Sequence, residues 1–210
     1  SDLYKGRFNE VNVNFLTDEE LSSIREKEFS GKGLELVRDM FVFSCYTGLA
    51  YIDIFNLTKD QLSKGIDGNL WIITNRQKTG SASNIPLLPV AEEIIKKYEN
   101  HPVSSNSGKL LPVYTNQKVN EYLKTIAENC GINKKLTFHC ARHTFATTVT
   151  LGNNVSMESV SKMLGHKSIK TTQHYAKILD SKVSQDMGSL KLVLEKKNEV
   201  QKENDKKLGS

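Results

Sequence analysis

A single stretch of β-type sequence lies between long stretches of helical periodicity, and this arrangement limits the fold more than any other feature. Residues 70–74 are rich in β-branched and aromatic side chains and follow the turn Asp67-Gly68-Asn69, and residues 83–87 read as a second short strand. The polar residues 75–81 between them form the tip of a hairpin. We therefore expect a mainly α-helical fold with one small antiparallel β-hairpin sheet, which is an α+β class.

The other segments have apolar residues at helical spacing, and several end at a glycine. The first helix begins at Thr17, which forms a capping-box signature with Glu20. Gly48 is expected to end the second helix, which is apolar on most sides. Residues 101–108 are expected to form a loop. The second helix spans 34–46, and a short helix or turn follows through Ile54 and Leu57. Further helices are expected over 90–98, 116–130, 137–151 and 156–164.

Composition excludes several classes of protein. Hydrophobic residues make up 38% and charged residues 25% of 210, so a sizeable core can form, and no apolar run approaches the roughly 18 residues of a membrane span. The three cysteines, Cys45, Cys130 and Cys140, lack metal-ligand spacing, and the first residues lack the pattern of a secretory signal. These features indicate a cytoplasmic protein without a membrane partner. The net charge of +5 is compatible with a nucleic-acid partner.

Four of the five histidines lie within residues 139–174. His139 and Arg142 are three residues apart in HCARHTFAT, so both project from one helical face. His166 follows Leu164-Gly165 just past a predicted helix end, and Tyr175 comes nine residues later. Upstream, Lys78 lies at the hairpin tip. Taken one at a time, each of these residues would usually be an ordinary core or surface residue.

Clustered histidines can also indicate a metal site. Ligand sets of this spacing normally include carboxylates or thiolates. The window 139–175 adds only Glu158 and Cys140. We therefore expect neither a metal nor any other cofactor.

The ordered set resembles the tyrosine recombinase (phage integrase) family. A hairpin lysine, then HCARHTFAT, then LGHKSIKTTQHYAK carry the resemblance, which runs from Thr17 to about Tyr175 and includes TGL at 47–49. TGLAYIDIFNL and RQKTG are most similar to the integrases of Bacteroides-type conjugative transposons. The resemblance implies a tyrosine recombinase catalytic-domain fold over 1–188. Residues 189–210, rich in lysine and glutamate, are expected to form a tail that is first helical and then charged and disordered. The stretch before Thr17 is too short for the family's N-terminal core-binding domain, which we therefore expect to be absent.

The resemblance also implies a function. The chain would be a site-specific DNA recombinase that cleaves and rejoins DNA through a 3′-phosphotyrosyl intermediate, for integration and excision of a mobile element. Tyr175 would be the nucleophile, His139 would accept its proton, and Lys78 would protonate the leaving 5′-oxygen. Arg142 and His166 would bind the scissile phosphate. Guanidinium forks suit phosphate oxygens, so this chemistry requires no metal.

One position departs from the family pattern. The first phosphate arginine of the family directly follows TGL, where this chain has Ala50. Asp53, three residues on, fits the family's acidic position. Arg76 lies two residues before Lys78, and in an extended strand these two side chains would share a face. We expect Arg76 to supply the missing charge; the alternative is that it contacts only DNA backbone or solvent.

Two other functions remain open. A DNA-binding regulator with a decayed active site would fit Ala50, and a type IB topoisomerase shares the tyrosine chemistry. The other site residues are intact, which argues against decay, and the short chain with its His-x-x-Arg-His-Thr block favours a recombinase.

The resemblance further implies which partners the chain has. They are double-stranded DNA attachment sites, accessory DNA-bending proteins and further copies of the chain in a homotetramer on DNA, whereas the chain alone would be a monomer. In the family such tails pack onto a neighbouring subunit. The apolar residues Leu190, Leu192, Val193 and Leu194 are therefore expected to dock in trans, or to fold back in cis.

Overall fold

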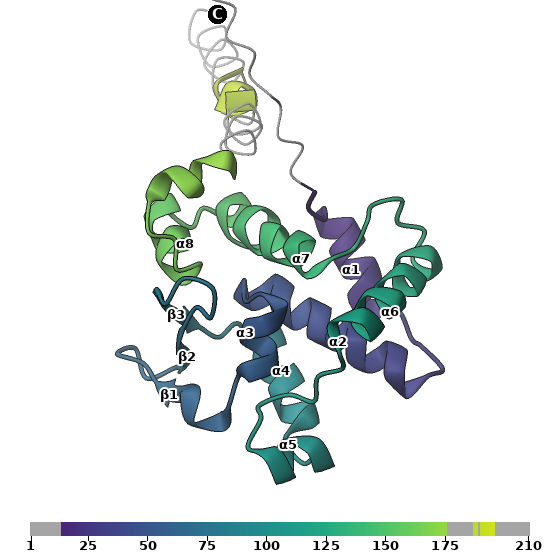
Figure 1. Ribbon diagram of the computed structural model, residues 1–210. Helices are drawn as coiled ribbons and strands as arrows, with labels where there is room; N and C mark the ends of the chain where they lie inside the picture. Colours follow the sequence, from purple (N-terminus) through teal and green to yellow (C-terminus); the bar gives the residue numbers. More distant parts are fainter. Residues whose placement is uncertain (1–13, 176–186, 189, 196–210) are drawn as a thin grey trace, which may run out of the picture. The chain divides into compact units, whose positions relative to one another are not determined.

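The computed structural model describes residues 14–175, 187–188 and 190–195 (Figure 1). The chain divides into two compact units, residues 1–174 and 175–210. In the second unit, residues 190–195 are helical, and Leu190, Leu192, Val193 and Leu194 are exposed there. The charged end of the expected tail, 196–210, lies outside the described residues. Within the described ranges, no helix combines the length and the apolar character that a membrane crossing needs.

Helix α2 (Lys32–Thr47) is the centre of the first unit. Its Phe41 and Phe43 side chains are fully buried. A helix that is covered by neighbours on several sides is apolar around most of its circumference, as the sequence of α2 is. It ends at Gly48, whose φ of 70° is left-handed, as predicted. The helices packed around it are α1 (Asp18–Glu26), α4 (Pro89–Tyr98), α6 (Asn116–Asn129) and α7 (Phe138–Thr144) (Figure 1).

The predicted start of the first helix is confirmed, but one predicted loop is wrong. The Glu20 amide donates to the Thr17 hydroxyl over 3.3 Å, and the Thr17 amide donates to the Glu20 carboxylate over 2.8 Å. Residues 102–107, expected to be part of a loop, form helix α5 (Pro102–Ser107). His101 caps its start through Nδ1, and proline is favourable in the first turn because its φ is already helical.

The sheet has three antiparallel strands in the order β1 (Leu62–Lys64), β2 (Leu70–Asn75) and β3 (Ala82–Pro86). The predicted hairpin of β2 and β3 is confirmed, with Ile72 opposite Ile85 and both side chains fully buried. Strand β1 was not predicted. It has three residues, too few to show an alternating pattern, and pairing with β2 defines it.

The helix expected over 137–151 changes its hydrogen-bond pattern. Helix α7 continues as a π-helix, Phe145–Thr150, and then as a 3-10 turn, Leu151–Asn153. The hydroxyl of Thr147 donates to the His143 carbonyl over 2.8 Å, and that of Thr150 donates to the Phe145 carbonyl over 2.7 Å. Such side-chain hydrogen bonds compete with the regular backbone hydrogen bonds of an α-helix. This competition is consistent with the change from α-helix to π-helix in this stretch.

The first described residues lie against this helical stretch. Leu16 is fully buried, its amide donates to the Thr144 hydroxyl over 2.9 Å, and its carbonyl accepts from the Thr148 hydroxyl. Both backbone groups of this core residue are therefore paired by threonine side chains.

Candidate active site

Arg142 lies between the ends of two helices. It is on α7, and its side chain is largely buried. Nη1 donates to the Gly48 carbonyl at the end of α2, and Nη2 donates to the Leu164 carbonyl at the end of α8 (Met157–Met163), each over 2.6 Å. The C-terminus of a helix attracts a cation. The guanidinium is thus held in a fixed orientation by two backbone carbonyls.

Arg76 is also buried, with 8% of its surface exposed. Its Nη1 lies 3.0 Å from the Asp53 Oδ2, but Nη1 makes no hydrogen bond within the described part of the chain. Burial lowers the pKa of Arg76 from its usual value, and the Asp53 carboxylate opposes this effect. Arginine stays charged in proteins. This buried side chain is therefore a positive charge held beside the Asp53 carboxylate.

The carboxylate of Asp53 connects the start of α3 (Tyr51–Asn56) to the hairpin. Oδ2 accepts from the Ala50 amide over 3.2 Å, and Oδ1 accepts from the Gln77 amide over 2.9 Å. With the ion pair to Arg76, one buried side chain holds three groups. Asp53 is thus the residue that orients Arg76.

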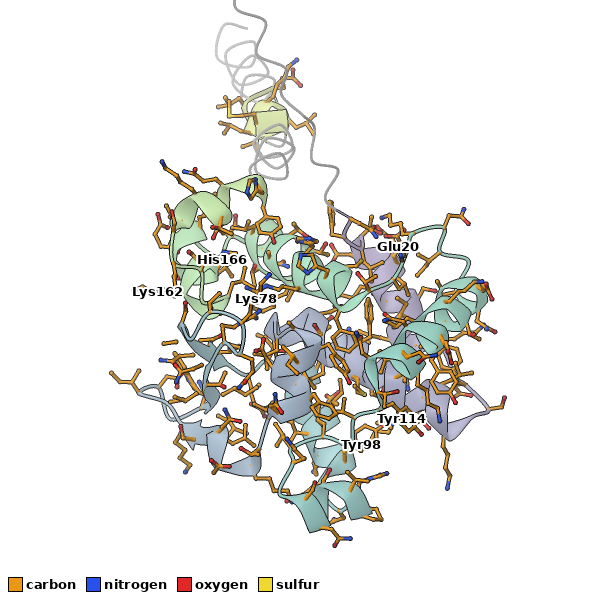
Figure 2. The ribbon with its side chains drawn as sticks, in the orientation of Figure 1. Glu20, Lys78, Tyr98, Tyr114, Lys162 and His166 are labelled. Atoms are coloured by element: carbon orange, nitrogen blue, oxygen red, sulfur yellow. The ribbon has the colours of Figure 1, made fainter. Side chains whose placement is uncertain are left out.

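The prediction that Arg76 and Lys78 share the face of an extended strand is wrong. Strand β2 ends at Asn75, and the amides of Thr79 and Gly80 both donate to the Arg76 carbonyl, so the chain turns here. Arg76 therefore points inward, whereas Lys78 is exposed on the hairpin (Figure 2). The two cations are still related, because both act on the same histidine.

That histidine is His139, one turn before Arg142 on α7. Partial burial lowers its pKa from the usual value, followed by the charges of Arg142, Lys78 and Arg76. Nearby cations disfavour an imidazolium. His139 is therefore neutral at pH 7, and its ring can accept a proton. Two of these cations, Lys78 and Arg76, come from the hairpin, and the third, Arg142, comes from α7 itself.

His166 comes directly after Gly165, just beyond α8 (Figure 2). Burial and then the charges of Arg142 and Arg76 lower its pKa to about 4, so His166 is neutral at pH 7. Its Nδ1 lies 2.9 Å from the hydroxyl of Thr172. The sequence pattern gave no reason to single out Thr172, because no spacing rule connects it to a histidine six residues earlier.

Tyr175 is the last residue of the 3-10 turn Gln173–Tyr175 and the first residue of the second unit. Its side chain is buried. Five of the six predicted site residues, Lys78, Arg76, His139, Arg142 and His166, lie in the first unit.

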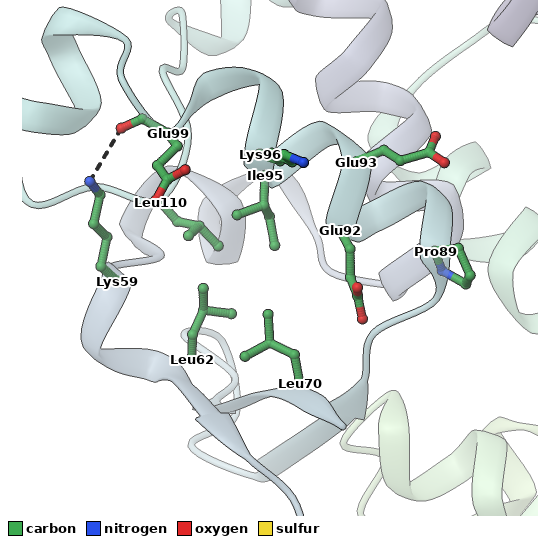
Figure 3. A pocket seen from close by; sticks show the side chains of 10 residues that line it. All are labelled: Lys59, Leu62, Leu70, Pro89, Glu92, Glu93, Ile95, Lys96, Glu99 and Leu110. Atoms are coloured by element: carbon green, nitrogen blue, oxygen red, sulfur yellow. Dashed lines mark hydrogen bonds between the residues drawn. The ribbon is translucent and has the colours of Figure 1, made fainter. Parts of the chain in front are cut away.

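Two cavities in the described part of the chain differ in the residues that line them. Across the described ranges, no group of three histidine, cysteine or acidic side chains is arranged to hold a metal ion. A cavity of about 540 Å³ lies between α8 and the hairpin, with His166 on its wall. A second cavity of about 540 Å³, between α4 and β1–β2, has a floor of leucine and isoleucine and an edge of charged residues (Figure 3). There the Lys59 ammonium donates to the Glu99 carbonyl over 3.4 Å, and no histidine, tyrosine or arginine is present.

Gly165 is required by the close approach of Arg76. Its φ is +62°, and an added Cβ would lie 2.8 Å from the Arg76 Cγ and 3.1 Å from the Ala82 carbonyl oxygen. We expect Gly165→Ala to lower the free energy of unfolding by about 2–4 kcal/mol, from left-handed strain and overpacking together.

Gly131→Ala is the matched control, since Gly131 has a φ of +65° and nothing within 4 Å of its added Cβ. Gly131→Ala should lower the free energy of unfolding by about 1 kcal/mol, from left-handed backbone strain alone. Urea denaturation of both variants measures the difference, and equal losses would contradict the proposed steric contact.

Comparison with known proteins gives a consistent result. The sequence model of the phage integrase family matches residues 14–182. Tyrosine recombinase XerC of Rickettsia canadensis (strain McKiel) is 28% identical over 180 residues, which are 80% of this chain and 54% of that protein. The chain thus spans about half the length of the curated relatives it matches.

Solved structures share the fold. The crystal structure of XerA recombinase superposes with a TM-score of 0.65 at 21% identity, covering 82% of this chain and 64% of that one. The integrase of transposon Tn1549, in complex with a circular intermediate DNA, gives a TM-score of 0.57 at 18% identity, covering 77% and 60%. The expected mainly α-helical fold with a small antiparallel sheet is confirmed.

Proposed function

Because the chain belongs to the phage integrase family, we propose that it is the catalytic domain of a site-specific DNA recombinase that cleaves and rejoins DNA through a 3′-phosphotyrosyl intermediate. The observation that carries this proposal is the pair of buried guanidinium groups held in place, Arg142 by two backbone carbonyls and Arg76 by the Asp53 carboxylate, with His139 one turn before Arg142. A phosphodiester is an anion, and its pentacoordinate transition state carries more charge on the nonbridging oxygens. Cations that are already in position stabilise this added negative charge, and a neutral base beside them can accept a proton.

The proposed reaction conserves the energy of the phosphodiester. The hydroxyl oxygen of Tyr175 attacks the phosphorus and its proton passes to His139. The bond from phosphorus to the 5′-oxygen breaks, and Lys78 gives the leaving oxygen a proton. Rejoining is the reverse, with a 5′-hydroxyl displacing the tyrosine. The lowered pKa of His139 supports the assignment, because only a neutral imidazole accepts a proton.

Arg142, Arg76 and His166 are the proposed phosphate ligands. Ala50 leaves the family's first arginine position without a charge. Arg76 replaces it in our proposal, supported by its burial and its ion pair with Asp53. A guanidinium held by a carboxylate is already oriented before DNA binds.

The test uses Arg76→Ala and the double variant Arg76→Ala with Ala50→Arg. Since the attachment site is not known, nicked duplexes with a randomised core are incubated with the protein, and covalent adducts are recovered and sequenced. On the selected duplex, Arg76→Ala should lower the single-turnover cleavage rate on the order of a hundredfold, the usual effect of removing one transition-state donor. Ala50→Arg in that background should restore part of the rate.

Arg25→Ala is the control, because in the described structure the side-chain hydrogen bond and the cation–π contact of Arg25 are both with Tyr46. Its cleavage rate should stay near that of the wild type. Cleavage by Arg76→Ala at the wild-type rate would show that the charge comes from elsewhere.

The same assay separates the other candidate functions. Selective DNA binding by the wild type without any covalent adduct would favour a regulator with a decayed active site. This alternative is tested because Ala50 stands where the family has its first phosphate arginine. Relaxation of a supercoiled plasmid that lacks the selected duplex would favour a topoisomerase.

We also propose that the reaction integrates and excises a mobile element of the conjugative transposon type. The fold shared with the Tn1549 transposon integrase and the motifs TGLAYIDIFNL and RQKTG support this. The proposed partners are duplex attachment sites, accessory DNA-bending proteins and three further copies of the chain in a cytoplasmic complex on DNA. The exposed leucines of 190–195 are the proposed contact between copies.

A further inference from the structure

The ring of His166 has a hydrogen-bond partner with a fixed backbone. Thr172 follows the 3-10 turn Ile169–Thr171 and is fully buried, and its hydroxyl lies 2.9 Å from the His166 Nδ1. The Thr172 amide donates to the Ile169 carbonyl over 2.8 Å, and the His166 amide donates to the Ser161 carbonyl over 3.0 Å. The contact between His166 and Thr172 therefore connects two backbone segments that are each fixed by a hydrogen bond.

His166 is a neutral ring in a cationic setting. Burial is the first cause of its pKa of about 4, and the charged or titratable groups that act on it are Arg142, Arg76, His174 and His143. A neutral imidazole carries one proton, so one ring nitrogen donates and the other accepts. The direction of the hydrogen bond at Nδ1 therefore determines whether Nε2 donates or accepts a hydrogen bond.

The burial of Thr172 decides that direction. Within the described ranges, Nδ1 is the hydrogen-bond partner of this hydroxyl, and no second partner is present. Buried polar hydrogens without an acceptor are rare, whereas an oxygen often leaves a lone pair unused. The Thr172 hydroxyl therefore donates its proton to Nδ1, and its oxygen accepts no hydrogen bond.

We propose that Thr172 is a positioning residue for the reaction, because its hydroxyl donates to Nδ1 and so holds His166 in the tautomer with the proton on Nε2. This inference rests on the proposed function, in which His166 binds the scissile phosphate. An Nε2–H group donates to a phosphate oxygen. The other tautomer would place a lone pair against the anion.

The test compares Thr172→Val, which deletes the hydroxyl at similar volume, with Thr172→Ser, which keeps it. Long-range proton–nitrogen NMR of the DNA-free protein at pH 7 reports which nitrogen of His166 is protonated. We expect Nε2–H in the wild type and in Thr172→Ser. Thr172→Val should gain the Nδ1–H tautomer, and its single-turnover cleavage rate should fall about tenfold, on the scale of one hydrogen bond.

Thr150→Val is the control for loss of a buried hydroxyl, because that hydroxyl donates to the Phe145 and Ala146 carbonyls. It should leave the tautomer of His166 unchanged. An Nδ1–H tautomer in the wild type would overturn the proposal, as would a Thr172→Val protein with an unchanged tautomer or with wild-type cleavage.

The NMR measurement needs no DNA, so it still decides the tautomer if the chain fails to cleave, an outcome that would contradict the proposed function alone. If Thr172→Val does not fold, the wild-type and Thr172→Ser spectra still decide the tautomer.

Discussion

Tyr175→Phe is expected to abolish the covalent protein–DNA adduct and to leave DNA binding nearly intact. The substitution removes only the hydroxyl that we propose as nucleophile, and the buried aromatic ring can still pack. Loss of a buried hydroxyl should lower the free energy of unfolding by about 1 kcal/mol, too little to unfold an ordinary domain. The adduct is measured on denaturing gels with the selected nicked duplex, and binding is measured by fluorescence anisotropy.

Tyr46→Phe is the matched control, since the Tyr46 hydroxyl accepts a hydrogen bond only from Arg25 in the described structure. It should form the adduct at the wild-type rate. An adduct that survives denaturation in Tyr175→Phe would assign the nucleophile to another residue.

Arg142→Ala is expected to lower the single-turnover cleavage rate on the order of a hundredfold or more. Arg142→Lys should recover little, because an ammonium lacks the planar fork that reaches both the Gly48 and the Leu164 carbonyls. Both variants leave buried carbonyls without a donor, which costs about 1–3 kcal/mol each. Cleavage is therefore measured below the thermal transition of each variant.

Arg38→Ala separates stability from catalysis. Its guanidinium also donates to two backbone carbonyls, those of Arg25 and Lys27, and it is paired with Asp39 on α2. Arg38→Ala should lose stability and keep the cleavage rate. Near wild-type cleavage by Arg142→Lys would contradict a role for the guanidinium fork.

The fold was largely predictable because its boundaries have local signals. The capping box of Thr17 and Glu20 and the left-handed Gly48 follow from side chains a few residues apart. Helix α5 was missed because residues 103–107 are mostly polar, although Pro102 and Gly108 are typical helix boundaries. The π-helical stretch after α7 has no simple sequence signal, since it depends on packing and on threonine hydroxyls.

In the candidate site, too, some contacts could be predicted from local sequence and others depend on the tertiary fold. His139 and Arg142 could be placed together because three residues on a helix define one face. The inward turn of Arg76 could not, because it depends on the Asp53 carboxylate, 23 residues earlier, and on the space left by Gly165. The carbonyls that hold Arg142 and the hydroxyl beside His166 belong to segments that only the tertiary fold brings together.

The pairing of Leu16 has a consequence for how the chain folds as it is synthesised. Leu16 leaves the ribosome before Thr144 and Thr148, which bind its amide and carbonyl and follow 128 and 132 residues later. At about 5–20 residues per second, roughly 6 to 26 seconds pass between the synthesis of Leu16 and that of its two hydrogen-bond partners. Contacts of such long sequence separation form late and slow the folding rate. Residues 14–17, directly before α1, are therefore expected to be among the last described parts of the first unit to become ordered, after the helix that carries Arg142 is complete.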